Sequence, residues 1–341
     1  MQGSMGSQSS VELEAVAKFN RMQGKLRVSL THACQLQCRF CHQEGIELHW
    51  RPVHISLDYF QTLLDVYSEV GGCYIELTGG EPLVHPRISE LLRLASAPNR
   101  HVSVHTNGLL LKKILPELQS GCVQLIKLSL HAAANSGTAK WLLGAAWDFD
   151  QVAANISCAV DLGTRVQLLY TLTQKNAADL PNVLDLALRW GVDLQLVDLI
   201  PARNKDTSCV VGYLGGHVFE EEVLRRATYQ TTIGDRTGAT LKIYRTPQGA
   251  TWELKDLHYG LFHSRMCVGC SLKSICGEGV YALRVDAAGI LKPCLLRQDL
   301  DVKSVTHPID KQQLRSTMTR LLTEMMADAP LGESELCPRN R

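Results

Sequence analysis

The stretch Cys34-Gln-Leu-Gln-Cys38-Arg-Phe-Cys41 follows a strand-like run, Leu26–Thr31, and places three cysteines within eight residues. Cysteine thiolates hold iron–sulfur clusters, and a [4Fe–4S] cube has four irons to ligate. Three thiolates leave one iron open, and an open iron can chelate a small molecule and pass an electron to it. A zinc knuckle is the alternative, but structural zinc sites usually take four ligands in paired groups. The stretch therefore predicts a cluster with one open iron.

The composition is that of an ordinary globular protein. The 341 residues are 45% hydrophobic and 20% charged, and the net charge is +1. This balance gives no general case for nucleic-acid or membrane partners, and no apolar run is long enough to cross a bilayer. Met1–Ser10 lacks the order of a signal peptide and reads as a polar tail. Twelve cysteines without a secretion signal predict metal binding in a reducing compartment, and we expect a cytoplasmic protein.

From Lys25 the sequence alternates between short β-rich runs and amphipathic stretches of helical period. Such alternation predicts parallel β/α units, which fit a partial (β/α)6 barrel or a doubly wound sheet. Both architectures collect their chemistry at the carboxyl ends of the strands. The predicted strands are Leu26–Thr31, Cys73–Thr78, Val102–Thr106, Leu125–Leu130, Val166–Leu172 and Leu194–Leu199. The predicted helices are Val11–Gln23, Leu57–Glu69, Arg87–Ala95, Leu110–Gln119, Phe149–Leu162 and Leu180–Trp190.

Polar motifs stand at three of these strand ends. The second strand ends in Thr78-Gly79-Gly80-Glu81-Pro82-Leu83, the third in His105-Thr106-Asn107-Gly108 and the fourth in Ser129-Leu130-His131. The glycines allow close approach of the backbone, and Glu81 offers an acceptor for an ammonium group. Ordinary turns and caps are the alternative for each motif taken separately. We expect His42 and His131 to be polar wall residues rather than metal ligands.

Near Pro201 the alternation stops, and a second, smaller α+β domain is predicted. Ala202–Gly216 reads as a loop over the barrel mouth, and Asp328–Arg341 as an irregular tail. We expect a tail at 1–24, the barrel at 25–235 and the second domain with the C-terminal tail at 236–341. The predicted elements are helices at Glu220–Ala227 and Gln312–Met326, and hairpin-like strands at Leu241–Arg245, Thr251–Leu254, Tyr281–Val285 and Ile290–Leu296.

The second domain carries its own cysteine group, Cys267-x2-Cys270-x5-Cys276, followed by Gly289-x4-Cys294. Four cysteines at short spacings in a chain without a secretion signal predict a metal site, for an iron–sulfur cluster or for zinc. The isolated cysteines Cys73, Cys122, Cys158 and Cys209 are expected to be buried thiols. The role of Cys337 stays open, since a tail cysteine could fold back as a ligand.

The spacing of Cys34, Cys38 and Cys41 resembles the signature of the radical S-adenosylmethionine (SAM) superfamily. The resemblance implies the partial barrel and a [4Fe–4S] cluster whose open iron binds the amino and carboxylate groups of SAM. Reductive cleavage of SAM, with an external electron donor of the flavodoxin or ferredoxin type, then gives a 5′-deoxyadenosyl radical. The residues it implies in contact with SAM are Phe40, Gly79, Gly80, Glu81, Thr106 and Ser129.

The second cysteine group resembles the auxiliary-cluster domains of radical SAM enzymes, of the SPASM and twitch types. The resemblance implies an auxiliary [4Fe–4S] cluster. We expect its four ligands to be Cys267, Cys270, Cys276 and Cys294, which would leave no iron for substrate.

Within the superfamily, Leu26 to about Arg297 is most similar to the GTP 3′,8-cyclases of molybdenum-cofactor biosynthesis, through Leu-Thr-Gly-Gly-Glu-Pro-Leu and Thr-Asn-Gly-Leu-Leu-Leu. Arg27 and Arg284 match substrate-binding arginines of that family, so we expect them to anchor an anionic group unless they are paired structurally. Other substrate-side positions depart from the family pattern. Basic or cysteine residues of the family are replaced by Tyr74, Glu76, Gln195, Gly277, Val280 and Ala282, and the chain ends Pro-Arg-Asn-Arg rather than Gly-Gly.

These departures predict weak triphosphate binding, because a triphosphate needs charge-assisted donors. We therefore expect a radical SAM enzyme, an oxidoreductase or a lyase, acting on a small polar substrate such as a sugar, nucleoside or related metabolite. A GTP 3′,8-cyclase-like enzyme is one alternative. A peptide-modifying maturase is another, less favoured because only a short tail precedes the first strand. The non-enzymatic alternative is an iron–sulfur or zinc protein that senses redox state.

Overall fold

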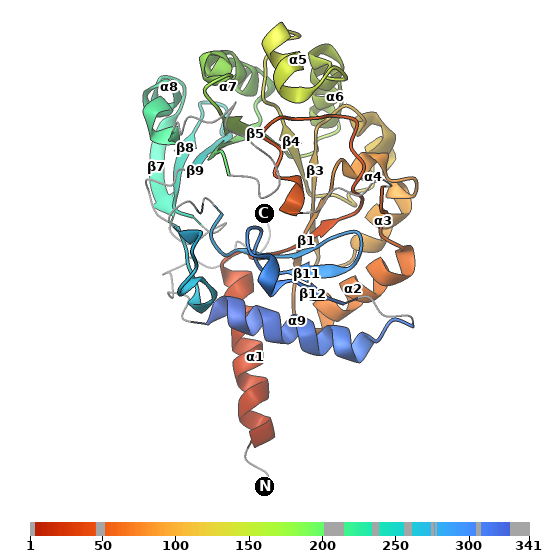
Figure 1. The fold of residues 1–341 in the computed structure, drawn as a ribbon. Coiled ribbons are helices and arrows are strands. Elements are labelled where there is room, and N and C mark those ends of the chain that lie inside the picture. Colours follow the sequence, from red (N-terminus) through yellow and green to blue (C-terminus); the bar gives the residue numbers. More distant parts are fainter. Residues whose placement is uncertain are drawn as a thin grey trace.

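The computed structural model describes residues 4–45, 52–200, 215–233, 239–255, 261–273, 276, 278–304 and 308–327. Its twelve described strands form one curved sheet, and helices cover the outside of the curve (Figure 1). The mixed α/β fold with parallel strands confirms the predicted fold class. The predicted loop and tail lie, except for 215–216 of the loop, outside the described residues.

The elements follow the predicted alternation closely through the first two hundred residues. The strands are β1 (Lys25–Ser29), β2 (Tyr74–Thr78), β3 (His101–Thr106), β4 (Leu125–Ser129), β5 (Val166–Leu172), β6 (Asp193–Asp198), β7 (Thr228–Ile233), β8 (Leu241–Arg245), β9 (Thr251–Lys255), β10 (Ala282–Val285), β11 (Ile290–Lys292) and β12 (Val302–Lys303). The helices are α1 (Ser4–Arg21), α2 (Leu57–Glu69), α3 (Ile88–Ala95), α4 (Leu115–Gln119), α5 (Gly137–Leu143), α6 (Phe149–Asp161), α7 (Leu180–Trp190), α8 (Glu220–Leu224) and α9 (Lys311–Met326).

Strands β1 to β6 are parallel and lie side by side in chain order. Their carboxyl ends therefore meet at one edge of the sheet, where ligands of such sheets bind. The register sets Arg27 of β1 beside Glu76 of β2, and His105 of β3 beside Lys127 of β4. These pairings bring polar and charged side chains from four strands to the inside of the curve.

The later strands extend the same sheet at both ends. β9 pairs in parallel with β6, and β10 pairs in parallel with β1. The antiparallel strands β7–β8 and β11–β12 then form the two edges. The predicted second domain thus shares the sheet of the barrel, and β10, which lies between Cys276 and Cys294 in the sequence, pairs with the first strand. Its boundary at 236 stays a prediction.

The packing follows from the side-chain periods of the elements. On β1, Leu26 and Val28 are completely buried in the hydrophobic core, whereas Arg27 between them faces the inside of the curve. Helix α2 begins at its cap Ser56 and buries Phe60 and Leu64, which are four residues apart and share one face. The strands therefore present apolar side chains to the helices and polar ones to the interior of the barrel.

Four elements differ from expectation. Helix α1 begins at Ser4, so most of the predicted polar tail is helical, and its first half stands away from the body of the molecule (Figure 1). Its second half packs against α9. Helix α5 and the strands β7 and β12 had not been predicted. Among the described residues, no helix combines the length and apolarity needed to cross a bilayer.

Candidate active site

The cysteine loop and the Gly-Gly-Glu segment are joined backbone to backbone. The amide of Gly80 donates to the carbonyl of Thr31 at 2.7 Å, and the amide of Glu81 donates to that of Ala33 at 2.8 Å. A Cβ atom at Gly79 would lie 2.4 Å from the Thr31 oxygen, and one at Gly80 would lie 2.3 Å from the Ala33 oxygen. Only glycine permits this approach, so the two motifs form one rigid junction.

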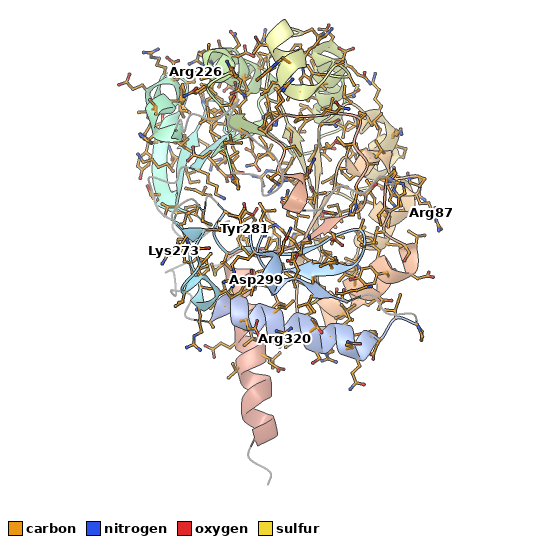
Figure 2. The ribbon with its side chains drawn as sticks, viewed as in Figure 1. Arg87, Arg226, Lys273, Tyr281, Asp299 and Arg320 are labelled. Carbon is orange, nitrogen blue, oxygen red and sulfur yellow. The ribbon has the colours of Figure 1, made fainter. Side chains whose placement is uncertain are left out.

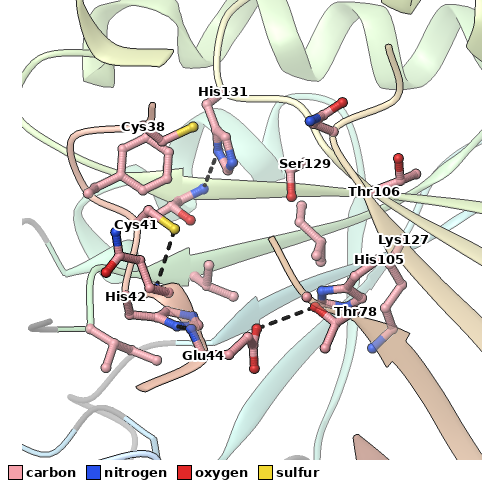
Figure 3. A pocket seen from close by; sticks show the side chains of 18 of the residues that line it. Cys38, Cys41, His42, Glu44, Thr78, His105, Thr106, Lys127, Ser129 and His131 are labelled. Carbon is pink, nitrogen blue, oxygen red and sulfur yellow. Dashed lines mark hydrogen bonds between the residues drawn. The ribbon is translucent and has the colours of Figure 1, made fainter. Parts of the chain in front are cut away.

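A pocket of about 260 Å³ opens beside this junction, inside the curve of the sheet. Its cysteine end holds Cys38 and Cys41 near His131, and its opposite end holds Thr78, His105 and Lys127 (Figure 3). The sequence-predicted residues that line it are Arg27, Cys34, Cys38, Phe40, Cys41, Gly79, Gly80, Glu81, Thr106, Ser129 and Arg284. The pocket therefore unites the first cysteine group, the expected SAM contacts and both candidate anchors.

Glu81 is buried and links the segment after β2 to the end of β3 through hydrogen bonds. Its carboxylate accepts hydrogen bonds from the Thr106 hydroxyl at 2.8 Å, the Asn107 amide at 2.7 Å and the Leu83 amide at 3.1 Å. Burial raises the pKa of Glu81 to about 7, although these donors oppose the shift. Its carboxyl group is thus balanced between the neutral and charged forms near neutral pH.

His131 and Phe40 form the wall above the cysteines. Their rings meet edge to face, with centroids 4.8 Å apart. The Nδ1 atom of His131 accepts a hydrogen bond from the Thr171 amide at 3.1 Å, and burial lowers the pKa of His131 to about 3. The imidazole is therefore neutral at physiological pH.

Helix α5 braces the cysteine loop from outside. The amide of Gln37 donates to the Leu143 carbonyl at 3.1 Å, and the amide of Arg39 donates to the Leu142 carbonyl at 2.9 Å. The Arg39 guanidinium also lies over the ring of Trp141, 4.4 Å from its centroid. Sequence reasoning missed this helix, although Ser136 caps its start and Gly144, with φ +103°, follows its end.

The floor of the pocket is a buried ion-pair network centred on Arg27. Its guanidinium donates to both oxygens of Glu44, at 2.9 and 2.6 Å, and also to Glu76. Glu76 accepts a second hydrogen bond from Lys127 at 2.6 Å and lies 3.4 Å from Lys25. Arg27, the expected anion anchor, therefore has two carboxylate partners within the protein.

Burial and neighbouring charges have opposite effects on the pKa values of the two carboxylates. Burial alone would raise the pKa of Glu76, but Lys127, Lys25, His105 and Arg27 hold it well below its usual range. Arg27 likewise outweighs burial and lowers the pKa of Glu44. Burial lowers the pKa of Lys25 to about 7 and holds that of His105 well below its usual range. Both carboxylates are thus charged and His105 is neutral.

A second ion pair lies on the wall formed by β10. Arg284 donates to the Glu278 carboxylate, and its guanidinium lies 5.3 Å from the centroid of the Tyr281 ring. Tyr281 sits in the middle of the molecule, whereas Arg87 and Arg226 lie on its periphery (Figure 2). Burial lowers the pKa of Arg284 to about 10. Both arginines of the candidate anchor pair are thus matched by carboxylates.

Sequence reasoning missed much of this floor. Lys25, Lys127 and Lys255 line the pocket, as do Glu44 and Glu278. The available signal was a charged residue inside an otherwise apolar strand, as in Leu-Ile-Lys127-Leu and Tyr-Ile-Glu76-Leu. Such a residue must face a polar interior, because burying an unpaired charge is costly.

The second cysteine group lines a separate, smaller pocket. Cys267, Cys270, Cys276 and Cys294 all border it, together with Gly279 and Val280. Residues 278–284 border both pockets, since Glu278, Tyr281 and Arg284 line the first and Gly279 and Val280 line the second. The structure therefore brings the four predicted ligands together, beside the wall that carries Arg284.

The donor sets suit clusters. All ten cysteines that the structure describes are free thiols. Within the described part of the chain, no three His, Cys, Asp or Glu side chains are grouped as for a single metal ion. A [4Fe–4S] cube takes each thiolate at a different iron, so its ligands are spaced more widely than those of one ion. Three thiolates in the first pocket and four in the second fit such cubes. Cys209 and Cys337 lie outside the described residues.

Comparison with known proteins shows the family of the chain. The model of the family described as "Radical SAM superfamily" matches residues 28–187. Two relatives named "Probable GTP 3′,8-cyclase" are each 30% identical: that of Sulfurisphaera tokodaii covers 84% of this chain and 86% of its own length, and that of Saccharolobus solfataricus covers 83% and 86%. The chain belongs to the radical SAM superfamily. Among its relatives are these probable GTP 3′,8-cyclases.

Solved structures support the fold. Streptococcus suis SuiB bound to S-adenosylmethionine matches with a TM-score of 0.57 at 13% identity, over 82% of this chain and 63% of SuiB. Native anSMEcpe with bound AdoMet matches with a TM-score of 0.53 at 13% identity, over 88% of this chain and 80% of that one. As a member of this superfamily, the chain is an enzyme whose cofactors are SAM and a [4Fe–4S] cluster. The auxiliary cluster at the second pocket stays a prediction.

Proposed function

We propose that the protein catalyses a reaction of the GTP 3′,8-cyclase type on a guanine nucleotide. The observation that carries this proposal is the 30% identity to probable GTP 3′,8-cyclases across 84% of the chain, joined to one pocket that runs from the cysteine triplet to Arg27 and Arg284. Forming a bond between C3′ and C8 requires removal of a hydrogen atom from the sugar. When bound, the cluster and SAM supply the 5′-deoxyadenosyl radical that removes it.

Each group of pocket residues has a proposed part in this reaction. Cys34, Cys38 and Cys41 hold the first cluster. Phe40, Gly79, Gly80, Glu81, Thr106 and Ser129 bind SAM, with Glu81 accepting from its amino group. The substrate lies toward Arg27 and Arg284. The four cysteines of the second pocket would hold the auxiliary cluster, which would supply redox chemistry next to the wall that carries Arg284.

The proposal requires an electron from outside for each SAM cleaved. We propose a small one-electron carrier of the flavodoxin or ferredoxin type as the donor. A cytoplasmic location stays a prediction.

A second candidate keeps the radical chemistry and changes the substrate to a sugar or another small polar metabolite. The ion pairs of Arg27 and Arg284 with carboxylates favour it, as do the four cysteines around one pocket. Four protein ligands would leave no iron for a guanine base.

The test is anaerobic reconstitution with iron and sulfide, followed by reduction with SAM and one candidate substrate at a time. The panel contains GTP, GMP, guanosine and a set of sugars. The proposal predicts that 5′-deoxyadenosine forms fastest with a guanine compound and that this compound is converted. Stimulation by a sugar alone would favour the second candidate, and no stimulation by any guanine compound would contradict the first.

A further inference from the structure

Away from Glu81, the lining of the pocket has almost no net charge to offer an anion. Among the described lining residues away from Glu81, five are basic and four are acidic, a formal net charge of +1. The basic residues are Lys25, Arg27, Lys127, Lys255 and Arg284, and the acidic residues are Glu44, Glu76, Asp198 and Glu278. A triphosphate brings about three to four negative charges, at least one for each phosphate. Placed here, it would be far from neutralised.

The carboxylates occupy the positions that a phosphate would need. Glu44 takes the Arg27 guanidinium in a two-point contact, the geometry in which arginine also grips phosphate. Glu76 lies between Arg27, Lys25 and Lys127. Both carboxylates are more than nine-tenths buried. A phosphate could reach Arg27 only by displacing a buried charge that would then lack its partner, which is strongly unfavourable.

The backbone fixes these carboxylates in place. Glu76 is a central residue of β2, in register between Arg27 and Ser103 of the neighbouring strands. Glu44 sits in a 3₁₀ turn, η1 (Gln43–Gly45), with φ +52°, a conformation uncommon outside glycine. The Thr78 hydroxyl also donates to Glu44 at 3.4 Å. Glu44 is therefore held over Arg27 by the fold, at a position that carries no sequence motif.

We propose that Glu44 and Glu76 are specificity determinants that exclude triphosphates, and that the substrate is a guanine nucleoside or a nucleotide with at most one phosphate. This inference rests on the proposed function and narrows its substrate class. The net charge of +1 suits a neutral or weakly anionic ligand. The neutral faces of His105 and Gln195, which also line the pocket, offer hydrogen bonds to sugar hydroxyls and a base.

The test measures equilibrium binding of GTP, GMP and guanosine to the cluster-loaded protein with SAM, at low and high salt. The wild type should bind GTP no more tightly than GMP. The double variant Glu44→Gln/Glu76→Gln keeps the side-chain shapes and frees Arg27, Lys25 and Lys127. It should bind GTP about tenfold more tightly than the wild type, with a steeper loss of affinity on adding salt, whereas its affinity for guanosine should stay within about twofold.

Two controls keep the outcome clear. Glu90→Gln removes one carboxylate from an exposed pair with Arg87, on the periphery of the molecule, and should change none of the three affinities. If the double variant does not fold, the inference is tested by two other results. Glu44→Gln alone should gain affinity for GTP, and the wild type should bind GTP no more tightly than GMP. Circular dichroism and iron content report folding independently of activity.

The failures are distinguishable. If the wild type binds and converts GTP at least tenfold better than GMP and guanosine, the proposed function stands and this inference is overturned. It is also overturned if the freed variant gains no affinity for GTP. If no guanine compound binds or stimulates 5′-deoxyadenosine formation, the proposed function fails and the inference fails with it.

Discussion

At the scale of single residues, Glu81 combines a structural contact set with a predicted contact to SAM. Three protein donors already face its carboxylate. A carboxylate can accept more than three hydrogen bonds, so an ammonium group can still be accommodated. Because burial raises the pKa of Glu81 to about 7, its charge near neutral pH depends on the environment.

We predict that SAM binding by the wild type strengthens as the pH rises through about 7. Deprotonation of Glu81 creates the charge that attracts the SAM amino group, and such a contact contributes roughly 1.5–3 kcal/mol. Glu81→Gln should bind SAM at least about tenfold more weakly, without this pH dependence and with unchanged iron content. Equilibrium dialysis between pH 6 and 8 measures the SAM affinity of both proteins. Equal affinities in the two proteins would show that the motif is only a turn.

The same residue gives a stability prediction of opposite sign. Its folded-state pKa of about 7 lies above the ordinary value of about 4.3, so the folded state holds the proton over a window in which the unfolded state has lost it. Glu81 therefore lowers the free energy of unfolding as the pH rises from about 4.3 to about 7. Urea unfolding of the wild type and of Glu81→Gln at each pH isolates the contribution of Glu81. The free energy of unfolding of the wild type minus that of the variant should fall as the pH rises. If this difference does not fall, the prediction is wrong.

Residue spacing predicted that the three cysteines lie together, but it did not predict the ion-pair network in the floor of the pocket. Cys34, Cys38 and Cys41 are close in sequence, so the loop alone brings them together, and all three line one pocket. Glu44 meets Arg27 only because a turn with positive φ aims it back over β1. No local pattern encodes that contact. Lys127 could have been found as a charge within an apolar strand, but its partner Glu76 lies on a strand 51 residues away.

At the scale of elements, the junction between the cysteine loop and the segment after β2 decides the geometry of the site. We predict that Gly80→Ala destabilises it by roughly 1–3 kcal/mol and lowers iron retention. The added Cβ would meet the Ala33 carbonyl oxygen at 2.3 Å, and that oxygen accepts the Glu81 amide. Chelator challenge and thermal unfolding measure the two effects.

Gly137→Ala is the matched control, because a Cβ there meets nothing within 4 Å. It should leave both iron retention and unfolding temperature close to the wild type. If Gly80→Ala behaves in the same way, the junction is looser than its contacts indicate.

Secondary structure was predictable where the period was long and clear. The helices α2 and α7 match their predicted ranges, because their apolar residues repeat over three turns. Helix α5 has only seven residues, too few for a periodic signal. The parallel pairing of β9 with β6 and of β10 with β1 joins segments far apart in the sequence. Hairpin-like runs predict neighbours along the chain, so they could not indicate these pairings.

At the scale of the whole molecule, two cysteine pockets share the wall formed by residues 278–284. We predict that the triple variant Cys34→Ala/Cys38→Ala/Cys41→Ala keeps an auxiliary [4Fe–4S] cluster held by four cysteines. Its electron paramagnetic resonance signal should not change on adding SAM or a nucleotide, because no iron is open. A shift of this signal on adding a guanine nucleotide would mean that one iron of the auxiliary cluster is open. Zinc bound by these four cysteines in place of a cluster would contradict the assignment of an auxiliary [4Fe–4S] cluster.

The central claim is that Cys34, Cys38 and Cys41 hold the cluster that cleaves SAM in the first pocket. The measurement is 5′-deoxyadenosine formation by the reconstituted, reduced protein, compared among wild type, the triple alanine variant and Cys122→Ala, whose cysteine borders neither pocket. The wild type and Cys122→Ala should form it at similar rates. The triple variant should lose about four irons per chain and form none. Continued formation of 5′-deoxyadenosine by the triple variant would contradict the claim.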